Sequence, residues 1–279
     1  MKNIVLLFTA LLLSNFGFSQ SKTASEYIEK ANLQLKKKNY EEAFNTLSLA
    51  IDEMPDSVSL YDMRGTLLET FRMYPEAIKD FTLGIEKTTD LKIKAHLLAN
   101  RGGTKYRIRD YAGSYNDLIK AVDLDSTNIA ALNNLAAVCE EVDKPDETLK
   151  YLNQIIRIDS NYVPAYVNLG FKYQSLGNHQ LAIEYFNFAV KLAPEEPLGY
   201  SNRSYSKLKT NDLKGALKDI NKSIKLFPTN SYAYKIRALI YLEKNKLDKV
   251  CSDLTKAEEL GYTQQYGEEV NTLKKKYCK

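Results

Sequence analysis

Few side chains in this sequence could perform catalysis or hold a metal ion. The 279 residues include two histidines and three cysteines. His96 and His179 lie far apart in the sequence, and neither has an evident serine, cysteine or carboxylate partner. The sequence has no P-loop, dinucleotide fingerprint, HExxH or EF-hand spacing. The carboxylate pair Glu140–Glu141 falls at an expected helix end, where solvation explains it. We therefore expect no enzyme, no metal site and no cofactor.

Charge argues against nucleic acid as a partner. The formal net charge is +4, from 39 basic and 35 acidic residues, which is too small an excess for a nucleic-acid-binding face. The lysine runs 36–38 and 274–276 fall toward expected helix C-termini, where they complement the exposed carbonyls. Binding of an acidic partner by these runs is the alternative.

Residues 1–20 have the features of a signal peptide. Lys2 gives a positive start, and Ile4 to Leu13 form an apolar run that is too short to span a bilayer. Gly17-Phe18-Ser19 offers a small-x-small site, which predicts cleavage near Ser19 or Gln20. A buried N-terminal helix is the alternative. We expect an exported protein, periplasmic or secreted, with no transmembrane segment in the mature chain.

The chain repeats itself every 34 residues. Asparagine recurs with this step at positions 100, 134, 168 and 202, and proline at 194 and 228. Such a period is the mark of a repeat architecture. It predicts seven units within residues 21–264, with residues 92–94 inserted between the second and the third. The units are 24–57, 58–91, 95–128, 129–162, 163–196, 197–230 and 231–264.

Each unit is expected to hold two helices joined by a tight turn. In the fifth unit, Tyr166 and Gly170 lie on one helical stripe, and Ala182 and Phe186 lie on another. Gly177 falls in the turn between them. All seven prolines of the chain fall at expected unit ends or helix starts, where a missing N–H costs little.

These units resemble the tetratricopeptide repeat. Tyrosine or leucine replaces the family's usual tryptophan at the fourth position, and the eighth position is always small: Ala31, Gly65, Gly102, Ala136, Gly170, Ser204 and Ala238. The resemblance implies an all-α fold, an α-solenoid wound as a right-handed superhelix. Residues 265–279 carry apolar residues at helical spacing and are expected to form a C-terminal capping helix.

Two cysteines are placed where they could pair. Cys251 falls near the start of the last unit's second helix, and Cys278 falls near the end of the expected capping helix. If these helices pack antiparallel, the two sulfurs come within bridging range, and export would let a disulfide persist. A resemblance to bacterial envelope repeat proteins with a similar ending supports this pairing; two free thiols are the alternative. Cys139 falls on a buried stripe and is expected to be a core residue.

Asparagine occupies the sixth position of four consecutive units, beside the buried stripe. A row of carboxamides can pair with the main chain of an extended peptide, and the pattern is similar to the asparagine ladder of O-linked N-acetylglucosamine transferases. Ordinary packing and solvation is the alternative. The predicted peptide-binding groove contains Asn100, Asn134, Asn168 and Asn202, together with Tyr106, Asn133, Phe171 and Tyr205.

The two-carboxylate clamp of chaperone-binding tetratricopeptide domains is not present, because its opening unit needs lysine and asparagine at the fifth and ninth positions. The first unit offers Ile28 and Asn32, and the second offers Asp62 and Thr66. The sequence thus predicts a non-catalytic scaffold that binds a protein or extended peptide, in a possible bacterial envelope complex. The alternative is an accessory or sensor subunit that binds a saccharide or a peptidoglycan-linked ligand.

Overall fold

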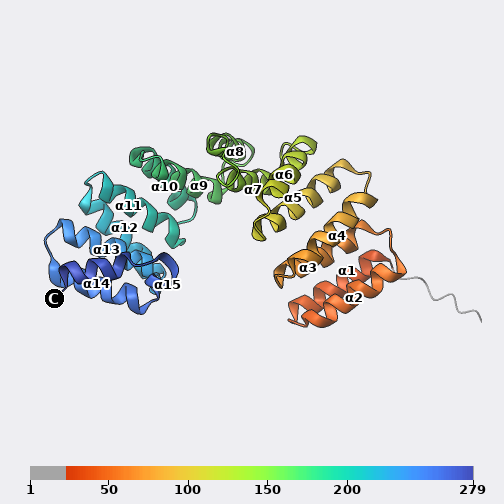
Figure 1. Cartoon of the computed structure of the whole chain (residues 1–279), viewed down its shortest axis with the longest axis horizontal. Coiled ribbons are helices and arrows are strands. Elements are labelled where there is room, and N and C mark those ends of the chain that lie inside the picture. The colour runs from red at the N-terminus through yellow and green to blue at the C-terminus, as the bar shows by residue number, and fades with distance from the viewer. Residues whose placement is uncertain (1–22, 279) are drawn as a thin grey trace, which may run out of the picture. The chain divides into compact units, whose positions relative to one another are not determined.

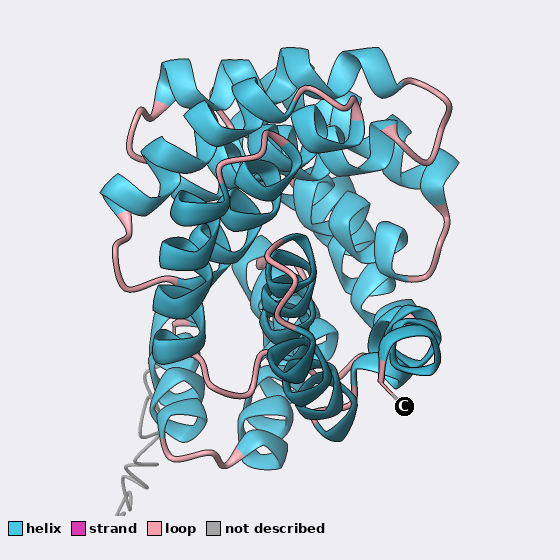
Figure 2. Cartoon of the chain, turned by 90° about the vertical axis from the view of Figure 1, so that its left-hand side faces the viewer, coloured by secondary structure: helices cyan, strands magenta, loops and turns pink. Residues whose placement is uncertain are grey.

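The computed structural model describes residues 23–278, so the predicted signal peptide lies outside the described residues. Residues 23–278 form helices and loops without a strand (Figure 2). They divide into two compact units, one ending at Lys87 and the other beginning at Thr88. None of the described helices is both long and apolar enough to cross a membrane.

The first unit consists of two helix pairs. They are α1 (Ala24–Lys36), α2 (Tyr40–Glu53), α3 (Val58–Thr70) and α4 (Tyr74–Lys87). A capping box starts α1, because Thr23 and Glu26 each bond the other's backbone N–H. The core is formed by alanines and larger apolar residues at helical spacing, among them Ala31 and Leu47, both fully buried.

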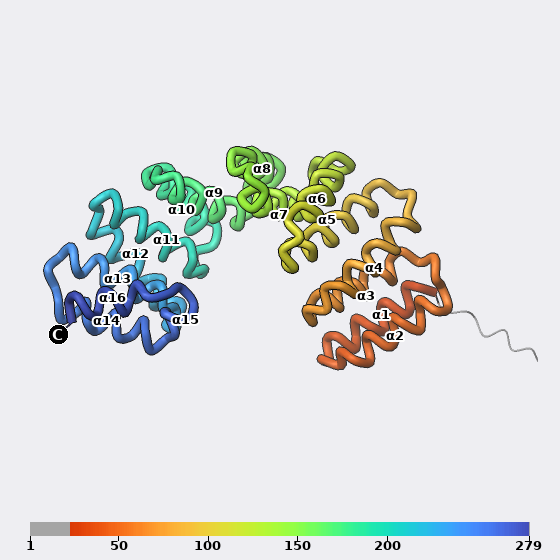
Figure 3. The backbone as a smooth tube through the Cα atoms, in the orientation of Figure 1, coloured from red at the N-terminus to blue at the C-terminus, as the bar shows by residue number. Residues whose placement is uncertain are grey.

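The second unit continues the pairs and ends with two shorter helices. In order these are α5 (Leu91–Arg107), α6 (Tyr111–Leu124), α7 (Ile129–Cys139), α8 (Pro145–Ile158), α9 (Val163–Ser175), α10 (His179–Leu192), α11 (Pro197–Lys209), α12 (Leu213–Leu226), α13 (Ser231–Glu243), α14 (Leu247–Glu259), α15 (Tyr262–Tyr266) and α16 (Glu269–Tyr277). Within each unit, every pair packs on the pair that follows it in the sequence (Figures 1 and 3). The fold class is therefore an all-α solenoid closed by C-terminal helices.

Small residues allow the two helices of a pair to approach closely. A Cβ atom added to Gly170 on α9 would lie 2.5 Å from Phe186 Cε1 on α10. The ring of Phe186 is fully buried, so it occupies the space that a larger residue at 170 would need. The eighth position is small for this reason.

The turn inside each pair needs a left-handed backbone. The fifteenth residue of all seven pairs has a positive φ, yet glycine fills this position in α9–α10 alone. The residues are Lys38 (φ 62°), Arg72 (61°), Arg109 (64°), Asp143 (58°), Gly177 (73°), Asn211 (64°) and Asn245 (53°). Six side-chain-bearing residues thus adopt a conformation that is unfavourable for them.

Two regions differ from the expected pattern. The inserted residues 92–94 lengthen α5 at its start, where Asp90 accepts hydrogen bonds from the N–H groups of Lys92 and Ile93. At the C-terminus, residues 265–279 do not form one helix, since α15 crosses the expected boundary and α16 follows it. Gly261 (φ 81°) and Gly267 (φ 90°) break the helix before and after α15.

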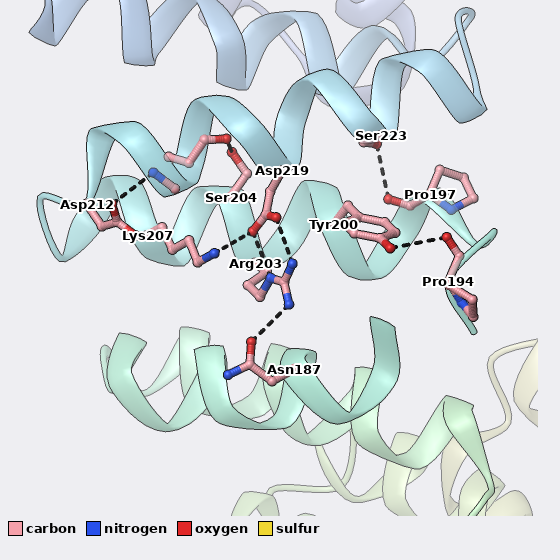
Figure 4. A network of polar contacts seen from close by, with 12 residues as sticks. Asn187, Pro194, Pro197, Tyr200, Arg203, Ser204, Lys207, Asp212, Asp219 and Ser223 are labelled. Atoms are coloured by element: carbon pink, nitrogen blue, oxygen red, sulfur yellow. Dashed lines mark hydrogen bonds and ion pairs between the residues drawn. The ribbon is translucent and has the colours of Figure 1, made fainter. Parts of the chain in front are cut away.

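Four pairs share an ion pair between their two helices. An arginine at the seventh position meets an aspartate sixteen residues later, and we call this contact the Arg–Asp clasp. The clasps are Arg64–Asp80, Arg101–Asp117, Arg203–Asp219 and Arg237–Asp253. Arg64, Arg203 and Arg237 also bond the preceding pair, as Arg203 does with Asn187 (Figure 4). The clasp therefore joins the helices of one pair and often two neighbouring pairs.

Candidate functional site

The eight residues predicted to bind a peptide lie on the first helices of four consecutive pairs. Asn100 and Tyr106 are on α5, Asn133 and Asn134 on α7, Asn168 and Phe171 on α9, and Asn202 and Tyr205 on α11. The structure brings some of these residues into contact and separates others.

Asn168 is the centre of the strongest candidate site. Its carboxamide Nδ2 donates a hydrogen bond to Asn133 Oδ1 at 3.1 Å, which joins α9 to α7. The side chain is half-buried. Asn168 also lines two separate cavities, one on each side of α9.

The first cavity lies between α7, α8 and α9 and has a volume of about 370 Å³. Ala136 and Leu152 contribute apolar lining, and Phe171 is 39% exposed beside them. The ring of Phe171 packs edge-on against Phe186, with 5.9 Å between the ring centroids. This packing holds Phe171 in place, so the cavity presents a preformed apolar surface.

A charged pair forms the polar part of this first cavity. Lys172 Nζ lies 2.5 Å from Glu140 Oε1, and the Thr148 hydroxyl donates to the same oxygen at 2.9 Å. The lysine side chain is 9% exposed, whereas that of Glu140 is 45% exposed. The local sequence around Glu140 predicts a solvated residue, because it gives no sign of a lysine one repeat later on the neighbouring helix.

The second cavity lies between α9, α10 and α11 and also has a volume of about 370 Å³. Its lining is mostly apolar and includes Val167, Ala189 and Leu198, with Glu196 as the charged member. Leu198 is 48% exposed. Leu198 is not among the predicted groove residues, and its only signal in the sequence is its place directly after the helix-starting Pro197.

Asn100 on α5 and Asn134 on α7 each contact a residue of α5. Asn100 Nδ2 lies 3.0 Å from His96 Nε2, one turn earlier on the same helix. The carboxamide of Asn134 covers Gly103, since a Cβ atom at 103 would lie 3.0 Å from Asn134 Nδ2. Tyr106 packs against Tyr111 with 5.4 Å between ring centroids, and its pKa is raised by burial and by Glu141.

Asn202 does not face a groove in this structure. It is 2% exposed, and its Nδ2 donates to Leu198 O one turn earlier at 2.9 Å. Gln174 Nε2 on α9 donates to the main-chain oxygen Asn202 O at 2.8 Å. Burial therefore keeps this carboxamide from a ligand, although the 34-residue spacing gave it the same place as the others. Tyr205, on the same helix, packs against His179 with 5.9 Å between ring centroids.

The cysteines and acidic residues complete the inventory of reactive groups. Cys251 and Cys278 form a disulfide between the start of α14 and the end of α16, with 5.5 Å between Cα atoms. Cys139 is fully buried, and burial raises its pKa to about 11. Residues 23–278 contain no group of three or more His, Cys, Asp or Glu side chains placed to hold a metal ion. The geometry around Asn168 supports binding through apolar contact and carboxamide hydrogen bonds.

Comparison with known proteins agrees with this architecture. The family model of the tetratricopeptide repeat matches residues 163–196, which contain α9 and α10. No curated protein matches the chain. A tetratricopeptide repeat protein from Parabacteroides merdae has a similar structure, with 19% sequence identity and a TM-score of 0.68, over 89% of this chain and 97% of that one.

Two further solved structures share the fold. PilF of Pseudomonas aeruginosa is 18% identical with a TM-score of 0.65, over 77% of this chain and 96% of PilF. YrrB, described as a tetratricopeptide repeat protein with an unusual peptide-binding site, is 18% identical with a TM-score of 0.54, over 68% of this chain and 97% of YrrB. Residues 163–196 therefore match the tetratricopeptide repeat directly, and the other helix pairs share the fold of solved tetratricopeptide repeat proteins.

Proposed function

We propose that the chain is a non-catalytic scaffold that binds an extended segment of a partner protein across α9. Asn168 bonds the main chain of the segment, and one apolar side chain enters the cavity on each side of the helix. The observation that carries this proposal is the position of Asn168, which lines both cavities.

The chemistry of the two cavities supports this mode of binding. A carboxamide can donate to a peptide carbonyl and accept from a peptide N–H at once. Each cavity falls within the range of about 300–1,000 Å³ that is usual for ligand sites. Phe171 and Leu198 would lose exposed apolar surface when the segment binds, which favours association. The proposed segment therefore has two apolar side chains, one on each side of its contact with Asn168.

The charged pair in the first cavity adds a polar requirement. Lys172 is largely buried beside the more exposed Glu140, so Glu140 Oε2 can accept from a donor on the partner. A basic or amide side chain next to the first apolar residue fits this arrangement.

The place of action belongs to the same proposal. Export is supported by the N-terminal segment, which reads as a signal peptide, and by the Cys251–Cys278 disulfide, which an oxidising compartment would preserve. The protein would then act in a bacterial cell envelope. Mass analysis of protein recovered from the periplasm tests this, because cleavage near Ser19 or Gln20 removes a defined mass.

The binding site is tested by selection from a peptide library with the immobilised mature chain. We expect the selected peptides to share two apolar positions. Their affinity is measured by fluorescence anisotropy. It should fall about tenfold in Asn168→Ala, because the hydrogen bond between the Asn168 carboxamide and the main chain of the peptide is lost. Leu198→Ala should give a comparable loss.

Gln180→Ala is the matched control, because Gln180 is an exposed residue on α10 that lines neither cavity. If the selected peptides bind Asn168→Ala and Leu198→Ala as tightly as the wild type, the binding surface lies elsewhere and the proposal is overturned.

A further inference from the structure

The outward face of α12 carries a line of lysines. Lys214, Lys218, Lys222 and Lys225 project from one side of the helix, because steps of four, four and three residues return to the same face. Three of the four are exposed and Lys222 is half-buried, whereas Ala216 and Ile220 on the opposite side are fully buried. We call these four residues the lysine row. At 1.5 Å per residue, the row is about 16 Å long.

Little acidic charge balances the lysine row. Among residues 23–278, the only acidic partner of the row is Glu195, which lies 3.5 Å from Lys222 and is itself 78% exposed. Asp219, the one acidic residue of α12, is bound by Arg203 and Lys207. With four lysines and one aspartate, α12 has a formal charge of +3.

The next pair shows that the repeat does not require these lysines. At the four corresponding positions α14 carries Asp248, Ser252, Lys256 and Glu259. With two lysines and four carboxylates its formal charge is −2. The clasp is the same in both pairs, since Arg237 and Asp253 take the places of Arg203 and Asp219. Packing therefore does not explain the lysine row.

A cavity of about 430 Å³ adjoins the row, between α10, α11 and α12. Lys218 and Lys222 line it together with Arg203 and Lys207, and Asp219 is its one carboxylate, so its lining has a formal charge of +3. The corresponding cavity beside α14 is lined by Arg237, Lys256, Asp253 and Glu259, with a formal charge of zero. The cavity beside α12 is thus positively charged, whereas the corresponding cavity beside α14 is neutral.

An aromatic side chain lies among these cations. The ring of Tyr200 lines the cavity, and its hydroxyl donates to Pro194 O at 3.2 Å, which fixes the ring. Arg203 Cζ lies 5.5 Å and Lys222 Nζ lies 6.0 Å from the ring centroid. The cationic groups attract negative charge, and the ring gives the cavity a flat apolar surface beside them.

We propose that the lysine row and its cavity bind an acidic polysaccharide, with one sugar unit beside Tyr200 and further carboxylate or sulfate groups along α12. A linear polyanion matches a single line of charges on one helix. A bilayer surface fits less well, because peripheral helices insert apolar side chains and no large apolar residue of α12 is exposed. This surface is separate from the two cavities beside α9.

Binding of polygalacturonate to the mature chain, measured by calorimetry at low ionic strength, tests the proposal. We expect binding that weakens with added salt, and no binding of uncharged dextran. Lys214→Gln/Lys218→Gln/Lys225→Gln should bind about tenfold more weakly, since three exposed ionic contacts, each of modest strength, are lost. The single variant Lys218→Glu, which changes one exposed side chain, should also weaken the binding of polygalacturonate.

The matched control is Lys92→Gln/Lys94→Gln/Lys120→Gln on α5 and α6, which removes the same net charge from another surface. Equal weakening in both triple variants, or no binding of polygalacturonate by the wild type, would overturn the proposal. Tighter binding of polyglutamate, or of phosphatidylglycerol vesicles, would replace the polysaccharide by an acidic peptide or a membrane and so also overturn it. Asn168→Ala should keep full polygalacturonate binding, which separates this outcome from that of the peptide site.

Discussion

Arg203 and Asp219 form a two-point contact between α11 and α12. Arg203 Nε lies 2.7 Å from Asp219 Oδ2, and Nη2 lies 2.7 Å from Oδ1 (Figure 4). The aspartate side chain is 4% exposed, and Lys207 Nζ donates to it at 2.9 Å. Arg203 Nη1 then donates to Asn187 Oδ1 on α10 at 2.9 Å. One guanidinium thus connects three helices.

Removing one partner of this clasp should destabilise the protein. Arg203→Met leaves Asp219 buried with Lys207 alone, and we expect the free energy of unfolding to fall by about 3 kcal/mol. Urea unfolding followed by circular dichroism measures the loss. A change within about 0.5 kcal/mol would show that the clasp contributes nothing of note.

The fifth repeat supplies the control for this experiment. Leu169, Tyr173 and Tyr185 occupy the places of Arg203, Lys207 and Asp219, and the two tyrosine rings stack with 5.3 Å between centroids. Because apolar groups can replace a buried ion pair at little cost, the triple change Arg203→Leu/Lys207→Tyr/Asp219→Tyr should retain most of the stability. If the triple variant loses as much stability as Arg203→Met, then the three residues of the fifth repeat cannot replace the clasp at this site.

Substitution by glycine should stabilise the protein at turns where another residue has a positive φ. Arg109 is exposed at φ 64°, and Arg109→Gly should raise the free energy of unfolding by up to about 1 kcal/mol, because glycine adopts this backbone without the cost to a Cβ atom. Gly177→Ala should lower it by about 1 kcal/mol. A Cβ atom at 177 meets nothing within 4 Å, so the backbone alone is tested. Thermal unfolding of both variants measures the change in stability. If both variants were stabilised, or both destabilised, the prediction would be wrong.

The Cys139 thiol should react slowly in the folded protein. Burial raises its pKa from 9.0 to about 11, so at pH 9.0 roughly one thiol in a hundred is ionised, compared with half for an ordinary cysteine. Since the thiolate is the nucleophile, iodoacetamide should modify Cys139 at least about fiftyfold faster in urea than in buffer. Mass spectrometry gives both rates, and rapid modification of the native chain would show that the thiol is accessible.

The sequence predicted the repeat more completely than the site. The 34-residue step and the prolines depend on local backbone rules, so they place helix pairs such as α9–α10 without tertiary information. The clasp can be seen in the sequence as an Arg–Asp spacing of sixteen residues, but only the structure shows that these residues form an ion pair between two helices. The burial of Asn202 is set by tertiary packing, which the 34-residue spacing does not encode. Long-range contacts of this kind also create the Lys172–Glu140 pair, and a periodic pattern carries no information about them.

The Cys251–Cys278 disulfide should stabilise α16 in particular. It closes a sequence separation of 27 residues. The other contacts of α16 include buried Val270, the ion pair of Glu269 with Lys235 at 2.8 Å and the ion pair of Lys274 with Glu258. In the chain-entropy model, a loop of this size gives about 2–4 kcal/mol. Cys278→Ser should therefore accelerate amide hydrogen exchange in α16 while α5 to α12 stay protected, because each repeat contacts only its neighbours. Cys139→Ala should leave the exchange of α16 unchanged. Equal exchange in Cys278→Ser and the wild type, or two alkylatable thiols at 251 and 278 without reductant, would show that other contacts hold the C-terminal helix.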